Sequence, residues 1–198
     1  MSRSPRYSAV AIALHWSIAL AVLALLAAGL WMSDAIKVPE TRNFAFRVYQ
    51  WHKSLGLTVL VLTLVRIGWR LTNPPPPLPA EVTRFERLAS GIAHAGLYGL
   101  MLAIPLAGWA MVSSSSLGFP TMVFGLFEWP HLPMLAGLED KKPAEALFKA
   151  THKYLAFGSM ALIALHVAGA LKHHFVNRDG VLARMLPGVR VKTETSIG

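Results

Sequence analysis

Long apolar runs separated by short polar stretches dominate this chain of 198 residues. A run of about 20 apolar residues is long enough to cross the hydrocarbon core of a bilayer as a helix. We predict four such helices, over residues 9–32, 48–71, 88–112 and 149–174. The first run is too long for the core of a signal peptide and has no small-residue cleavage motif after it, so we expect it to be retained.

The connections between these helices predict a single-domain, all-α membrane protein over residues 1–198, a four-helix bundle with up-down-up-down topology. The longest connection, residues 113–148, holds four consecutive serines followed by aromatic residues. Aromatic side chains favour the headgroup region, so we expect this connection to cap one end of the bundle. The proline run 74–77 ends the second helix and acts as a stiff spacer.

Composition and charge narrow the function classes. The net charge is +9, but the basic residues lie at the ends of the apolar runs, so we attribute them to anionic lipid headgroups and expect no nucleic-acid partner. The side that holds both termini carries the larger share of Lys and Arg, which predicts that both termini are cytoplasmic. The absence of cysteine excludes disulfides, Cys-bound iron–sulfur clusters and covalently attached c-type haem.

Histidines inside the apolar segments indicate the chemistry, because ionisable side chains in hydrocarbon usually mark functional sites. Five of the eight histidines lie there: His15, His52, His94, His152 and His166. His152 and His166 share one helix at a spacing that gives about 21 Å of rise and nearly the same face. One helix that offers an imidazole near each side of a membrane suggests two stacked metal centres, for which haem iron is the natural candidate.

Depth along the helices sorts these histidines into two levels. His52 and His152 lie at the outer level, and His15, His94 and His166 lie at the inner level. A haem held by two imidazoles needs one histidine from each of two helices at the same depth. The outer pair follows directly, whereas His166 can pair with either His15 or His94.

Other residues fit a flat, acidic macrocycle. Gly56 follows His52 by one turn and lets a large ring approach the backbone, although it also suits ordinary helix packing. Arg66 shares the face of His52 at the inner level, where it can bind a haem propionate or extend to the headgroups. Lys53 and Lys153 are candidates for the same role at the outer level.

Several motifs together resemble the bacterial cytochrome b561 family over nearly the whole chain. They are residues 13–16 (ALHW), 52–56 (HKSLG), 65–66 (VR), the proline run, 94–98 (HAGLY), His152, His166, 170–175 (ALKHHF) and 177–185. The resemblance implies two b haems, the outer one bound by His52 and His152 and the inner one by His15 and His166. His94 then lies beside the inner haem, where it can bond a propionate.

The resemblance also implies a function in the bacterial inner membrane. Both irons would be six-coordinate, so we expect electron transfer between a periplasmic donor and ubiquinone or another quinone. Some relatives oxidise superoxide and reduce ubiquinone, and others are cytochrome b subunits of hydrogenases or dehydrogenases, which leaves both as alternatives. We place a quinone site beside the inner haem, at His174 with His173 and Lys172, because histidine titrates near neutrality and can deliver a proton; the alternative is that this cluster only anchors the helix at the interface.

Overall fold

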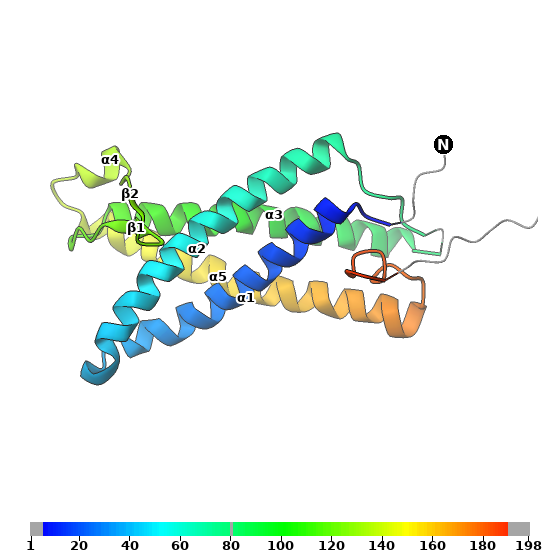
Figure 1. Ribbon diagram of the computed structural model, residues 1–198, viewed down its shortest axis with the longest axis horizontal. Coiled ribbons are helices and arrows are strands. Elements are labelled where there is room, and N and C mark those ends of the chain that lie inside the picture. The colour runs from blue at the N-terminus through cyan, green and yellow to red at the C-terminus, as the bar shows by residue number, and fades with distance from the viewer. Residues whose placement is uncertain (1–5, 80, 190–198) are drawn as a thin grey trace, which may run out of the picture.

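The computed structural model describes residues 6–79 and 81–189. Four long helices form the bundle in Figure 1: α1 (Ala9–Ala35), α2 (Pro39–Thr72), α3 (Arg84–Ser113) and α5 (Lys142–Lys172). Each is long and apolar enough to cross a membrane, which confirms the predicted all-α membrane bundle. Arg3, Arg190 and Lys192, three of the basic residues behind the orientation prediction, lie outside the described residues.

Consecutive long helices run in opposite directions, as the up-down-up-down topology requires. In Figure 1 the start of α1, the connection from α2 to α3 and the end of α5 lie at one end of the bundle. The turn between α1 and α2 and the segment between α3 and α5 lie at the other end. The first end is nearer the inner level of histidines and the second is nearer the outer level, so we call them the inner end and the outer end.

Three helices begin earlier than the apolar runs predicted. The second starts at Pro39 instead of residue 48, the third at Arg84 instead of residue 88, and the fourth at Lys142 instead of residue 149. The added first turns contain polar residues, so the hydropathy pattern placed the start of each helix too late. Their start signals are local: a proline occupies one of the first two positions of α2 and of α5.

The start of α3 carries a capping box. The Thr83 side chain accepts a hydrogen bond from the backbone N–H of Glu86, and the Glu86 carboxylate accepts one from the backbone N–H of Thr83. Each residue thereby satisfies one of the backbone donors that a helix start leaves without a partner. This local signal fixes the helix start four residues before the apolar run.

The end of α5 also differs from the prediction, which continued an ordinary helix to residue 174. The α-helix stops at Lys172 and continues as a single π-turn, η1 (His173–Asn177). Arg178 follows with φ 54° and Gly180 with φ 74°, so the chain reverses direction there. A left-handed residue after a helix is a common way to end it, and here that residue is an arginine rather than the favoured glycine.

The connection 113–148 caps the outer end, as predicted, but contains regular structure. Strands β1 (Thr121–Val123) and β2 (Phe127–Trp129) pair antiparallel, and a short helix, α4 (Pro133–Ala136), follows. Phe124 (φ 48°) and Gly125 (φ 75°) form the tight turn between the strands. Two successive positive φ angles are typical of a type I′ turn, which matches the twist of a hairpin.

Three polar residues of α2 hold this hairpin. Gln50 and Lys53 donate to the Pro120 carbonyl at 3.1 and 2.7 Å. The Ser54 hydroxyl, only 1 % exposed, accepts from the Phe124 N–H at 2.9 Å and approaches the Met122 carbonyl at 3.1 Å. The hairpin is therefore fixed to the outer half of α2, next to the turn that carries His52.

Small side chains are frequent among the buried residues of the long helices. They are Ala45 and Ser54 of α2, Ala107, Ala110 and Ser113 of α3, and Ser159 of α5. Close helix approach through small residues is how membrane helices pack. Helix α3 packs along α5, α1 along α2, and α2 against α3, whereas α5 makes scarcely any close backbone contact with α1 or α2.

The chain after η1 folds back over the inner end. The Trp16 indole N–H donates to the Met185 carbonyl at 2.9 Å, and the Arg184 guanidinium donates to the Pro77 carbonyl at 2.7 Å. The proline run thus provides a carbonyl acceptor in addition to acting as a spacer. These bonds join α1, the α2–α3 connection and the C-terminal segment at one end of the bundle.

Replacing Ser54 tests the docking of the hairpin. Ser54→Ala leaves the Phe124 N–H without its buried acceptor, which costs about 1–3 kcal/mol. We expect a lower Tm of the detergent-purified protein and faster proteolysis within residues 117–132. The control is Ser33→Ala, because the Ser33 hydroxyl is exposed and bonds only the Leu30 carbonyl of its own helix. Equal Tm values for the two variants would contradict this account of the docking.

Candidate haem site: two levels of histidine

The outer level brings together His52 of α2 and His152 of α5. Their ring centroids lie 6.3 Å apart and the ring planes are inclined by 68°. The backbones of the two helices come close at scarcely any point, so the imidazoles bridge the distance between them. Both residues are those that the sequence placed at this depth.

The inner level brings together three histidines from three helices. The rings of His15 (α1) and His166 (α5) have centroids 6.3 Å apart and are inclined by 70°. His94 (α3) lies closer to His166, with centroids 5.2 Å apart. The His94 Nδ1 is 2.8 Å from the Ser90 carbonyl of its own helix, which holds this ring against α3.

The distances between ring centroids show which pairs of histidines could bind one metal ion between them. Because a metal–imidazole nitrogen bond is about 2.0 Å long and that nitrogen is about 1.1 Å from its ring centre, two rings on opposite sides of one metal have centroids about 6.2 Å apart. The His52–His152 and His15–His166 distances match this value. The His94–His166 distance is about 1 Å shorter than such a metal bridge needs.

The ring nitrogens at the outer level fit ligation. The His152 Nδ1 is 2.9 Å from the Ile104 carbonyl, so it carries the proton and leaves Nε2 as the electron-pair donor. A metal-bound histidine usually makes such a bond with its other nitrogen. The His52 Nδ1 is buried and has no hydrogen-bond partner among the described residues. A buried polar nitrogen without a partner is unfavourable, which leaves this ring able to accept a further contact from a bound group.

The donor set points to a macrocycle rather than to a bare metal ion. Among the described residues, no group of three or more His, Cys, Asp or Glu side chains could hold a metal ion. A pair of imidazoles fills only two positions of a six-coordinate iron. The four nitrogens of a porphyrin supply the other positions, which makes haem the group that these pairs fit.

Two glycines lie against the outer rings, and Gly56, which the sequence pattern suggested, is not one of them. A Cβ at Gly29 would lie 3.4 Å from the His52 Cε1, and one at Gly108 would lie 3.1 Å from the His152 Cε1. These two glycines come from α1 and α3, so no spacing within α2 or α5 could reveal them. A Cβ at Gly56, the position that was singled out, meets no atom within 4 Å.

Arginine and tyrosine side chains gather near the inner histidines. The Arg66 Nε donates to the Tyr98 hydroxyl at 2.9 Å, and the Arg70 guanidinium lies 5.8 Å from the centre of the same ring. Burial raises the pKa of the Tyr7 hydroxyl, and the charges of Arg70 and Arg66 oppose that rise. None of the ion pairs in the described part of the chain includes Arg66 or Arg70. This cluster of positive charge is suited to an anionic group.

Lysines near the outer histidines are less suited to that role. The Lys53 ammonium is already bonded to the Pro120 carbonyl at 2.7 Å. Lys153 is exposed.

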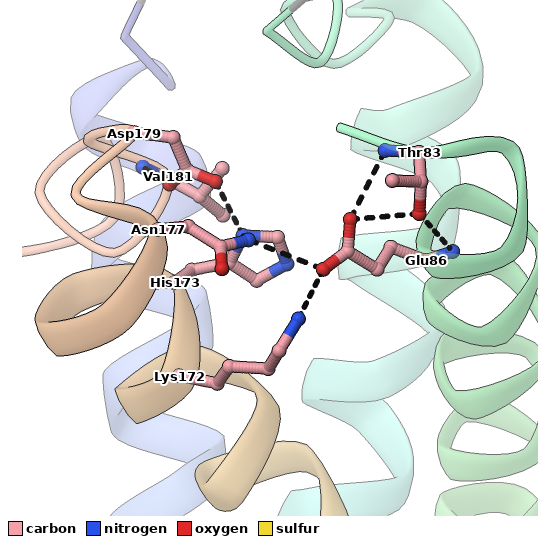
Figure 2. Close-up of polar contacts among 7 residues, drawn as sticks. All are labelled: Thr83, Glu86, Lys172, His173, Asn177, Asp179 and Val181. Atoms are coloured by element: carbon pink, nitrogen blue, oxygen red, sulfur yellow. Dashed lines mark hydrogen bonds and ion pairs between the residues drawn. The ribbon is translucent and has the colours of Figure 1, made fainter. Parts of the chain in front are cut away.

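Figure 2 shows Lys172 and His173, two of the three residues predicted for a quinone site, at the inner end of α5. The Lys172 ammonium forms an ion pair with Glu86 of α3, and the His173 Nδ1 lies 2.5 Å from Asp179. His174, the third predicted residue, is exposed and makes an edge contact with the Phe175 ring. Glu86 and Asp179 were not predicted, because their roles depend on contacts between separate elements.

Comparison with known proteins identifies the relatives of this bundle. Residues 6–188 match the family model of prokaryotic cytochrome b561. The chain is 35% identical over 182 residues to cytochrome b561 homolog 2 of Escherichia coli strain K12, covering 91% of each chain. It is 36% identical over 193 residues to a protein of Yersinia pestis named probable superoxide oxidase CybB, covering 93% of this chain and 98% of that protein.

A third relative, cytochrome b562 of Cereibacter sphaeroides, is 29% identical over 94% of this chain and 98% of its own. The family match spans almost all of the described residues, so the family assignment holds for the whole bundle. The family name implies a b-type haem. The chain belongs to the prokaryotic cytochrome b561 family of membrane electron-transfer proteins.

Proposed function

We propose that this protein transfers electrons across the bacterial inner membrane through two b haems, one bound by His52 and His152 and the other by His15 and His166. The observation that carries the proposal is the equal centroid distance of 6.3 Å in both pairs, one at each level. When bound, each haem supplies a one-electron carrier. The two imidazoles of each pair would hold the haem iron and would leave it closed to oxygen, so the chemistry that the group would supply is electron transfer.

The protein residues would orient and charge-balance the bound groups. The Ile104 carbonyl fixes the tautomer and orientation of His152. Arg66 is the proposed partner of an inner propionate, since it has no carboxylate partner in the described part of the chain and a guanidinium matches a carboxylate in geometry. His94 is held by Ser90 beside His166 and is the second proposed propionate contact.

The proposed route runs from a periplasmic donor at the outer end to quinone at the inner end. The distribution of basic residues supports cytoplasmic termini, and we accordingly propose that the β1–β2 hairpin faces the periplasm. The inner end carries the proposed quinone site, formed by His174, His173 and Lys172. Quinone reduction consumes protons, and a group of titratable side chains at a membrane edge can supply them from the cytoplasm.

A second candidate function is that of a superoxide:ubiquinone oxidoreductase. It is favoured by the relative named probable superoxide oxidase, which this chain matches over 93% of its length. Superoxide would then be the periplasmic donor, and the same two haems would serve. The two candidates differ only in the donor, so one experiment on the donor separates them.

The haem content tests the central proposal. The purified protein reduced with dithionite should show a b-type spectrum and two haems per chain. We expect His152→Ala to retain one haem, because it removes an axial ligand of the outer site. His94→Ala should retain both.

The matched control is His131→Ala, which alters a histidine between strand β2 and α4, away from both levels. This variant should keep two haems. Loss of a haem in His94→Ala together with full haem content in His15→Ala would overturn the inner assignment in favour of a His94–His166 pair.

Arg66 is expected to set the potential of the inner haem. A nearby positive charge favours the reduced form, so Arg66→Gln should lower one of the two midpoint potentials by about 30–60 mV, where 59 mV is a tenfold change for one electron. Redox titration followed by optical absorbance measures both potentials. Arg42→Gln, an exposed arginine at the outer end, should leave both unchanged. A shift of neither potential in Arg66→Gln would argue that Arg66 only extends to the headgroups.

A pulse of superoxide distinguishes the donors. If superoxide is the donor, the oxidised protein should be reduced within the lifetime of the pulse, and added ubiquinone-1 should then be converted to quinol. Superoxide dismutase should abolish both signals. Haem reduction by a chemical donor but not by superoxide would eliminate the second candidate and leave another periplasmic donor.

A further inference from the structure

The π-turn at the end of α5 brings a carboxylate back onto a histidine of the same helix. The Asp179 Oδ2 lies 2.5 Å from the His173 Nδ1, and the Asp179 N–H contacts the His173 carbonyl at 3.4 Å. The Asp179 side chain is only 3 % exposed, and the His173 side chain is 15 % exposed. Figure 2 shows the imidazole between Asp179 and Glu86, with its second nitrogen on the side away from Asp179.

The surrounding bonds determine which nitrogen of His173 carries the proton in the neutral ring. The Asn177 amide nitrogen is 3.3 Å from the His173 Nδ1, but it is a donor and has the Glu86 carboxylate as an acceptor at 3.1 Å. The His173 Nδ1 therefore donates to Asp179, which can only accept when ionised. The other oxygen of Asp179 accepts from the Val181 N–H at 3.1 Å, so the carboxylate is fixed at both oxygens. The His173 Nε2 is left to gain and lose a proton.

The same network distinguishes the three residues predicted for the quinone site. Lys172 is held in an ion pair with Glu86, which also caps α3 through Thr83. His174 is exposed and has only the edge contact with Phe175 among the described residues. Only His173 combines a fixed orientation, partial burial and a carboxylate partner.

We propose that Asp179 and His173 form a proton-transfer dyad, in which Asp179 is a positioning residue and His173 delivers protons to a quinone bound at the inner end. This inference rests on the proposed quinone reduction. Conversion of a quinone to a quinol adds two electrons and two protons. The electrons come from the b haems. For each proton, the N–H bond at the His173 Nε2 breaks, an O–H bond forms at a quinone oxygen, and the imidazole regains a proton from cytoplasmic water.

The charges around His173 make Asp179 the residue to change. The titratable groups around it are Asp179 from the following turn, Glu86 from α3, and Lys172 from the preceding end of α5. His174 follows it in the sequence, and its ring contacts Phe175. Glu86 and Lys172 neutralise each other. Asp179 is thus the one charged group bonded to the ring that has no basic side chain as an ion-pair partner among the described residues, so its removal changes the charge beside the ring.

The experiment follows reoxidation of the chemically prereduced haems by ubiquinone-1 in the purified holoprotein. The rate is measured between about pH 6 and 9, the range around which histidine titrates. In the wild type the rate should fall at alkaline pH as His173 loses its proton. Asp179→Asn removes the stabilising charge, so the pH of half-maximal rate should move down by about one unit. Asp179→Glu, which keeps the charge, should restore most of that shift.

Asn177→Ser is the matched structural control. It breaks the link between Asn177 and Glu86 in the same network without changing any charge, so the pH of half-maximal rate should stay at the wild-type value. An Asp179→Asn profile with the wild-type midpoint, at full haem content, would overturn the dyad while leaving quinone reduction intact. A wild-type protein that ubiquinone-1 does not reoxidise would instead overturn the proposed function and the dyad with it.

A second variant, His173→Gln, tests the dyad if Asp179→Asn does not fold. His173→Gln removes the titrating ring but keeps a polar side chain, so the alkaline fall of the rate should disappear and the rate itself should drop at least tenfold. Persistence of the same alkaline fall in His173→Gln would show that another group titrates and would overturn the dyad.

Discussion

The separation of α5 from α1 and α2 is the constraint on which this bundle depends. Helix α5 packs closely against α3 but makes few close backbone contacts with the other two helices, and pairs of imidazoles join it to α1 and α2 at two depths. A membrane bundle has little hydrophobic drive to close such a space, because lipid solvates apolar side chains as well as the interior does. Small residues such as Ala107 of α3 and Ser159 of α5 are buried in the helices that do pack closely. The proposed haems would complete the interior between α5 and helices α1 and α2.

The two ends of the bundle differ in structure and in charge. At the outer end the hairpin is fastened to α2 by Gln50, Lys53 and Ser54, which places ordered backbone directly above the His52 turn. At the inner end, the arginine and tyrosine cluster provides positive charge near His15 and His166, and the C-terminal segment joins the proline run across it. A rigid outer cap and a charged, proton-accessible inner end suit a protein that accepts electrons at one side and reduces quinone at the other.

The apolar pattern predicted the four helices, their alternating direction and the level of the five histidines inside them, because these depend only on length and periodicity along one chain. It missed the polar first turns of α2, α3 and α5, where proline and a capping box continue the helix beyond the apolar run. The outer pair, His52 and His152, was the sole choice at its depth and needed no further information. The inner level stayed open, since the depth of His166 agrees equally with His15 and His94.

The sequence by itself determined that this chain crosses the membrane four times with histidines at two levels, because hydropathy and helical rise are properties of each segment alone. Only the tertiary structure decided the distances between helices. It placed the ring centroid of His15 at 6.3 Å and that of His94 at 5.2 Å from the ring centroid of His166. It also set Gly29 and Gly108 against the outer rings and turned Asp179 back onto His173. Each of these contacts joins residues from different helices or from across a chain reversal, and how such elements meet depends on packing that no single segment encodes.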